Sequence, residues 1–143
     1  MFTYKKELNV RAKEIYDLLL DQIAYEASEK SGRKIEAKDI AKGCRYNYKR
    51  MNGKNEITAY VDVKEPSFEK IETCYEMQGN KYVFAYGIQP VGEDRCELSY
   101  TQEGGQSGML SDFFMKRSMS KRFAAFENTI LQRRKQGNKD TSE

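Results

Sequence analysis

The sequence contains no histidine and no tryptophan, and only three cysteines among its 143 residues. Without an imidazole, a Ser-His-Asp triad, a Cys-His nucleophile and the usual histidine-containing zinc sites are excluded. Cys44, Cys74 and Cys96 are far apart, odd in number and outside any Cys-x-x-Cys motif, so we interpret them as ordinary half-buried thiols of a reducing compartment. We therefore expect neither a metal nor a cofactor.

Long apolar runs are missing as well. No stretch approaches the ~20 apolar residues that a membrane span requires, and the opening MFTYKKELNV lacks the apolar core of a secretory signal. We therefore expect a cytoplasmic protein with no membrane span. A chain of this length favours one domain, here residues 1–136, followed by a disordered polar tail over residues 137–143.

The first clear pattern that is present is the 3.6-residue apolar period of an amphipathic helix. It runs from Arg11 to about Lys30, with Asn9 expected as the N-cap. Gly32 suits the left-handed conformation that a helix C-cap often needs, so the helix should end there. A short second helix is expected around residues 37–41.

A second amphipathic helix is predicted from Met109 to about Arg134. It follows a glycine-rich loop at residues 104–108, which we interpret as a hinge. Between positions 116 and 139, eight basic residues stand against the single acidic residue Glu127, a balance of +7 in a chain whose net charge is +3. We expect the outer face of this helix to be strongly basic.

Between the two helices the apolar period changes to two, as in strands with one buried face. Asn52-Gly53 is typical of the tight turn of a hairpin. The connections within this region are too short for the crossover that parallel pairing requires, so the sequence predicts an antiparallel meander. A further strand is expected at residues 2–9, where the alternation is weaker. Together the expected strands cover residues 2–9, 44–49, 56–63, 68–77, 81–89 and 95–102.

Helices segregated from a consecutive meander indicate the α+β class. The wide apolar stripe of the terminal helix needs a concave apolar surface on which to be buried. We therefore expect a curved antiparallel sheet of about six strands wrapped around a long C-terminal helix, with one or two short N-terminal helices.

Two segments carry a resemblance to a known family: the step Ile40-Ala41-Lys42-Gly43 into an aromatic strand, and FFMKRSMSKRFAAFENTI at residues 113–130. With the order of elements, they make the chain similar to the START-like superfamily, also called helix-grip, Bet v 1-like or polyketide-cyclase-like. Within it, the chain resembles a family of Gram-positive bacteria called domain of unknown function 3284. The superfamily implies a cavity between sheet and terminal helix that often holds an apolar small molecule, lipid or hormone.

The candidate site is therefore an apolar cavity. Tyr46, Tyr75, Tyr86 and Tyr100 either point hydroxyls into it and fix the polar end of a ligand, or simply fill the core. We expect an apolar or amphipathic small molecule to contact one group of residues on the sheet and the terminal helix: Ile57, Ala59, Val61, Ile71, Thr73, Tyr75, Leu98, Tyr100, Phe123, Phe126 and Ile130.

A second hypothesis is an interaction module, in which the basic C-terminal helix binds an acidic macromolecule or the protein forms a homodimer. The small net charge and the lack of a recognition motif argue against nucleic acid as the partner. The sequence shows no pair of carboxylates at a diagnostic spacing, so we do not expect catalysis.

Overall fold

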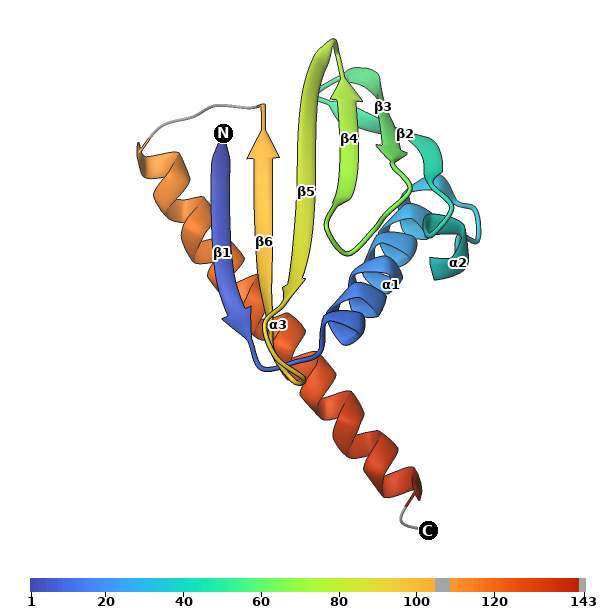
Figure 1. Cartoon of the computed structure of the whole chain (residues 1–143). Coiled ribbons are helices and arrows are strands. Elements are labelled where there is room, and N and C mark those ends of the chain that lie inside the picture. The colour runs from blue at the N-terminus through green and yellow to red at the C-terminus, as the bar shows by residue number, and fades with distance from the viewer. Residues whose placement is uncertain (105–108, 142–143) are drawn as a thin grey trace.

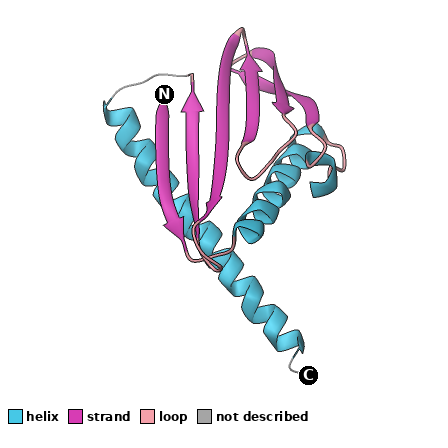
Figure 2. Ribbon diagram, viewed as in Figure 1, coloured by secondary structure: helices cyan, strands magenta, loops and turns pink. Residues whose placement is uncertain are grey.

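The computed structural model has an α+β fold in which one face of a six-stranded antiparallel sheet is covered by two long helices (Figures 1 and 2). The structure describes residues 1–104 and 109–141, with side chains described for 1–104 and 112–137. Apart from Gly104, the expected glycine-rich hinge lies outside the described residues. The elements are β1 (Phe2–Leu8), α1 (Ala12–Ser31), α2 (Ala37–Ile40), β2 (Cys44–Asn52), β3 (Asn55–Val63), β4 (Ile71–Met77), β5 (Asn80–Pro90), β6 (Cys96–Glu103) and α3 (Met109–Thr141).

The sheet has the strand order β1-β6-β5-β4-β3-β2, with every neighbouring pair antiparallel. The predicted meander from β2 to β6 is confirmed, and β1 adds to its far edge by pairing Phe2 with Gln102. The hairpin at Asn52-Gly53 is also confirmed, because Asn52 pairs with Asn55. Gly53 has a φ of 67°, a conformation that glycine adopts without steric cost.

The end of α1 is as expected, but its start is not. Gly32 has a φ of 73° and its N–H donates to the Ser28 carbonyl at 3.0 Å, which closes the last turn. The prediction that Asn9 caps the helix is wrong, since Arg11 is the N-cap residue. The backbone N–H of Asn9 instead donates to the Glu127 carboxylate of α3 at 2.9 Å, which ties the β1–α1 connection to the last helix.

The two long helices share one face of the sheet, which we call the inner face. α3 runs behind β1 and β6 in Figure 1 and packs on β1, whereas α1 packs on β2 and β5. The helices also contact each other. The expected sheet wrapped around the terminal helix is therefore present, but α1 covers a second part of the inner face.

Buried side chains form two clusters under these helices. The first joins α3 to α1 and to the β1, β5 and β6 strands through, among others, Leu8, Ile15, Leu98, Phe123 and Phe126. The second joins α1 and α2 to β2 and β3 through, among others, Leu20, Ala27, Ile40, Tyr46 and Val61. α1 therefore contributes to both clusters, whereas the buried residues of α3 belong to the first.

The C-terminal helix is longer than expected, since it continues beyond Arg134 to Thr141. The single domain over 1–136 and the disordered tail over 137–143 stay predictions. Within the part of the chain that the structure describes, neither long helix combines the length and the apolar character needed to cross a membrane.

Glu14 connects the start of α1 to α3. Its Oε1 accepts the backbone N–H of Arg11 at 2.9 Å, and its Oε2 accepts Nε–H of Arg134 at 2.8 Å. The hydrogen bond from Arg134 is the main reason that the pKa of Glu14 lies below its ordinary value of 4.5. Its carboxylate therefore both caps one helix and anchors the other.

Replacing Glu14 by glutamine is expected to lower the free energy of unfolding by about 1 kcal/mol at pH 7, the size expected for a partly exposed ion pair that also caps a helix. Because the pKa of Glu14 is lowered in the folded state, its contribution is complete above the ordinary value and is lost as the pH falls through the lowered one. Urea unfolding of wild type and variant from pH 7 to 3 should show the two converging. Glu29→Gln, an exposed site on the same helix, is the control, and an equal loss there would contradict the assignment.

Candidate ligand-binding cavity

A cavity of about 1020 Å³ lies in the middle of the inner face. Its floor is formed by strands β2 to β6, and α1 and α3 form its walls. From α1 the lining extends from Leu18 to Lys30, and from α3 it extends from Arg122 to Arg133. The cavity is partly open to solvent, and its volume is comparable with that of pockets that bind drug-sized ligands.

The strand register explains why aromatic side chains dominate the floor. Side chains on one face of a sheet alternate along each strand, and paired residues on neighbouring strands lie on the same face. The paired inner-face residues of β2 to β6 therefore form rows across the floor. The three rows are Tyr46, Val61, Tyr75 and Tyr82; then Thr73, Phe84 and Gln102; then Ile71, Tyr86 and Tyr100.

One end of the cavity, at β2 and β4, has a polar group in contact with aromatic rings. The hydroxyls of Tyr48 and Tyr75 are hydrogen bonded to each other, and Lys30 Nζ donates to the Tyr48 hydroxyl at 3.4 Å. The same ammonium lies 4.9 Å from the centroid of the Tyr48 ring and 2.7 Å from a carboxylate oxygen of Glu26. Burial lowers the pKa of Lys30, but Glu26 and Tyr48 outweigh burial and raise it, so Lys30 is a cation that already has a partner.

At the other end, polar groups of β5, β6 and α3 come together. Arg122 Nη1 donates to the Tyr86 hydroxyl at 3.4 Å, and the Tyr100 hydroxyl donates to Gln102 Oε1 at 2.8 Å. Burial raises the pKa of Tyr86, and it raises the pKa of Tyr100 to about 12. Both phenols are therefore protonated at neutral pH and able to donate.

The residues predicted to contact a ligand separate into two groups. Five of them line the cavity: Val61, Ile71, Thr73, Tyr75 and Tyr100. The other six lie outside its lining: Ile57, Ala59, Leu98, Phe123, Phe126 and Ile130. The apolar stripe of α3 is buried directly against the sheet, where Leu98 and Phe123 have no exposed surface, and so it is not available to face the cavity. All four tyrosines considered as sources of hydroxyls line the cavity, at Tyr46, Tyr75, Tyr86 and Tyr100.

The sequence interpretation missed the contribution of α1 and the basic residues of the lining. Leu18, Leu19 and Ile23 of α1 form part of the wall, together with Lys30. The signal was present, because leucines beside the main apolar stripe make that helix apolar over a wider arc than one contact needs. The lining residue Arg122 gave no such signal, since an arginine at the edge of a stripe resembles any solvated residue.

The family model described as "Domain of unknown function (DUF3284)" matches residues 2–120. The chain belongs to the DUF3284 family. A search of curated proteins gave no match to this DUF3284 chain.

Two solved structures are similar to the DUF3284 chain over nearly its full length. One is a START superfamily protein from Mycobacterium smegmatis, with a TM-score of 0.57 and 13% identity, covering 91% of this chain and 96% of that one. The other is a protein from Thermus thermophilus, with a TM-score of 0.52 and 12% identity, covering 92% of this chain and 97% of that one. At this level of identity the similarity shows that this chain has a START-like fold.

The sequence predicts that the arginines of α3 form a basic outer face, but in the DUF3284 structure several of them contact other parts of the chain. Arg122 reaches into the cavity lining, Arg133 lies 3.7 Å from the Asp21 carboxylate of α1, and Arg134 binds Glu14. Three of the arginines expected on a basic outer face therefore make contacts within the chain. Docking of an acidic macromolecule on α3 and homodimerisation stay predictions.

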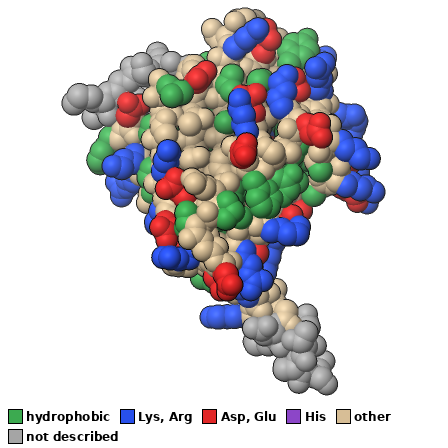
Figure 3. Space-filling view, viewed as in Figure 1, with side chains coloured by type: hydrophobic (Ala, Val, Ile, Leu, Met, Phe, Trp, Pro, Cys, Tyr) green, Lys and Arg blue, Asp and Glu red, His purple; other side chains and the backbone are tan. Residues whose placement is uncertain are grey.

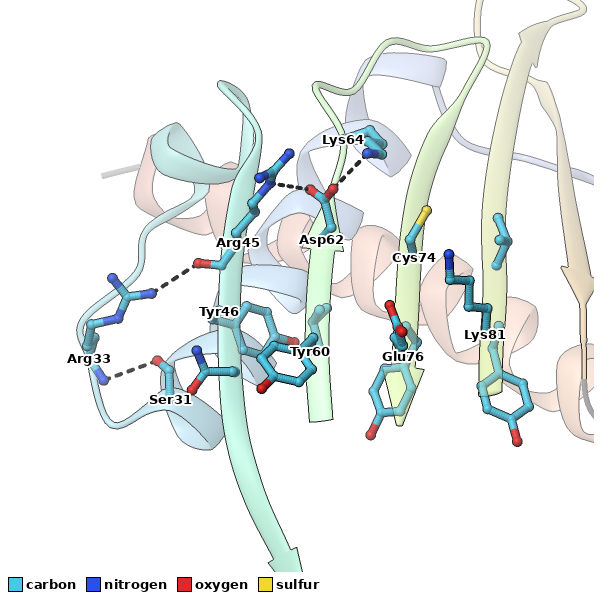
Figure 4. A pocket seen from close by; sticks show the side chains of 15 residues that line it. Ser31, Arg33, Arg45, Tyr46, Tyr60, Asp62, Lys64, Cys74, Glu76 and Lys81 are labelled. Atoms are coloured by element: carbon cyan, nitrogen blue, oxygen red, sulfur yellow. Dashed lines mark hydrogen bonds and ion pairs between the residues drawn. The ribbon is translucent and has the colours of Figure 1, made fainter. Parts of the chain in front are cut away.

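A second hollow of the DUF3284 chain, of about 920 Å³, lies on the opposite, outer face of the sheet (Figure 4). The Asp62 carboxylate there lies 3.4 Å from Arg45 Nε and 2.7 Å from Lys64 Nζ, and the hydrogen bond from Lys64 is the main reason that its pKa is lowered. Figure 3 shows both signs of charge interspersed over the visible face of the molecule. In the outer hollow, the Asp62 carboxylate is thus already paired with Arg45 and Lys64. This pairing favours the inner cavity as the candidate site.

Proposed function

We propose that this DUF3284 protein binds an apolar or amphipathic small molecule in the cavity between the sheet, α1 and α3. The observation that supports the proposal most strongly is the contrast between this space and the core beside it. The core side chains Ile15, Leu98 and Phe123 have no exposed surface, whereas the cavity retains about 1020 Å³ bounded largely by aromatic and aliphatic side chains. Apolar surface removed from water there contributes about 25 cal/mol per Å² to binding.

We also propose that the protein is located in the cytoplasm. Cys44, Cys74 and Cys96 are free thiols, and burial raises the pKa of each. Thiols that stay protonated and unpaired fit a reducing compartment. Since none of the three lines the inner cavity, they are not part of the proposed binding site.

The proposal predicts saturable binding of a neutral apolar probe. In a fluorescence titration, N-phenyl-1-naphthylamine should bind the native protein at about one molecule per chain, because the inner cavity is large enough for it and is lined by aromatic and aliphatic side chains. At saturation the probe should also raise the melting temperature, since it binds the folded state alone. A signal that rises without saturation, or a melting temperature that does not move, would reject the proposal.

A further inference from the structure

The charged residues that line the inner cavity are unequal in sign. Four are basic and two are acidic, and all six are exposed residues, so the solvent-accessible part of the lining has a surplus of positive charge. The basic residues are Lys30, Arg50, Arg122 and Arg133, and the acidic ones are Asp21 and Glu26.

Both carboxylates of the lining already have a cationic partner. Glu26 lies 2.7 Å from Lys30 Nζ, and Asp21 lies 3.7 Å from Arg133 Nη1. Among the side chains that the structure describes, no ion pair involves Arg122 or Arg50. The surplus charge therefore belongs to two guanidinium groups whose nearby carboxylates are engaged elsewhere.

Arg122 has a defined position rather than a free one. It precedes Phe126 by four residues on α3, so the two side chains lie on the same side of the helix. The Phe126 ring is buried and packs against the Tyr86 ring at a centroid distance of 6.3 Å. This ring contact lies one turn from Arg122, which reaches the hydroxyl of the same Tyr86.

The polar groups around Arg122 can donate hydrogen bonds to a ligand. Tyr86 accepts from Arg122, so its own O–H remains free to donate. Gln102 accepts from Tyr100 through its carbonyl oxygen, which leaves its amide N–H groups as donors. Tyr86 and Gln102 lie on adjacent strands one row apart on the cavity floor. A guanidinium, a phenol and an amide that all donate fit an oxyanion better than any neutral or cationic group.

We propose that the ligand of this cavity is an anionic amphiphile, with an apolar body against the aromatic and aliphatic walls and one oxyanion bound by Arg122, Tyr86 and Gln102. The inference rests on the proposed function and adds the chemical class of the ligand to it. Cationic amphiphiles are disfavoured because the two carboxylates of the lining are already paired.

Two fluorescent probes separate this inference from the proposed function. 1-Anilinonaphthalene-8-sulfonate and N-phenyl-1-naphthylamine share one ring skeleton and differ by the sulfonate. Arg122→Gln is expected to weaken binding of the sulfonate probe by about tenfold, the usual effect of losing a charge-assisted hydrogen bond, and to change binding of the neutral probe less than about twofold. Arg122→Lys should retain part of the sulfonate affinity, because the charge remains while the planar fork is lost.

Arg117→Gln is the matched control, since it removes the same charge from an exposed position of the same helix outside the cavity lining. It should change neither affinity. Tyr86→Phe, which removes only the hydroxyl, should weaken the sulfonate probe several-fold, and it provides an independent variant if Arg122→Gln does not fold.

The outcomes are distinct. Equal losses for Arg117→Gln and Arg122→Gln, or no selective loss of the sulfonate probe in Arg122→Gln and Tyr86→Phe, would overturn the anionic ligand and leave the proposed function standing. If neither probe binds the wild-type protein saturably, the proposed function fails and this inference fails with it.

Discussion

Replacing Phe123 by alanine is expected to lower the free energy of unfolding by about 3–5 kcal/mol, the range found when a buried aromatic ring is removed from a core. Phe123 has no exposed surface. Its ring packs edge-on against Tyr4 of β1 at a centroid distance of 4.9 Å and stacks on Phe126 at 6.2 Å. Alanine leaves a space where α3 meets the sheet, which neighbouring side chains refill only in part. Chemical denaturation followed by circular dichroism measures the difference.

Phe113 supplies the matched control for this substitution. It lies on the same helix and loses the same atoms when changed to alanine, but 61% of its surface is exposed. Phe113→Ala should therefore change the free energy of unfolding by no more than about 0.5 kcal/mol. If the two variants lost similar amounts, α3 would not be docked through Phe123, and the division between core and cavity would have to be abandoned.

The second large effect is expected from filling the cavity. Thr73→Trp adds a large ring to the floor of the cavity, between Val63 and Phe84 on the neighbouring strands, and should weaken binding of N-phenyl-1-naphthylamine by about tenfold or more. The free energy of unfolding should change little, because the added ring enters space that is already open. Both quantities are measured on the same preparation, by fluorescence titration and by chemical denaturation.

The control for Thr73→Trp is the same substitution on the other face of the sheet. Thr58 of β3 precedes the buried Ala59, so its side chain points to the outer face. Thr58→Trp should leave probe binding within about twofold of wild type. Unchanged binding in Thr73→Trp would show that the probe occupies a different site.

Much of the fold could be predicted because local signals and tertiary structure agree. Asn52-Gly53 placed the first hairpin of the meander, and Gly32 placed the end of α1. Strand alternation also identified inner-face residues, so Val61 and Thr73 were correctly assigned to the face that lines the cavity. Because side chains alternate between the two faces of a strand, the sequence pattern shows which residues share a face. This is enough to predict the residues of a cavity floor that is built from adjacent strands.

The walls of the cavity could not be predicted in the same way. An apolar stripe on a helix can be buried against the protein core or against a bound ligand, and the sequence does not distinguish these two cases. Phe126 and Ile130 were therefore assigned to the cavity, whereas the structure buries them against the sheet. Arg122 was placed on the basic outer face of the terminal helix, whereas the structure brings it to the Tyr86 hydroxyl at the cavity, a position that depends on tertiary packing alone.

The pairing of β1 with β6 also affects how the protein is made. Phe2 is translated well before its partner Gln102, and β1 is an edge strand of the described sheet, where it pairs with β6. A nascent chain therefore carries β1 without its partner strand until β6 has been translated, and closing so long a loop is slow compared with forming the hairpins in between. Lys5 and Lys6 lie in β1, and their positive charge discourages this strand from pairing with other chains before β6 is available.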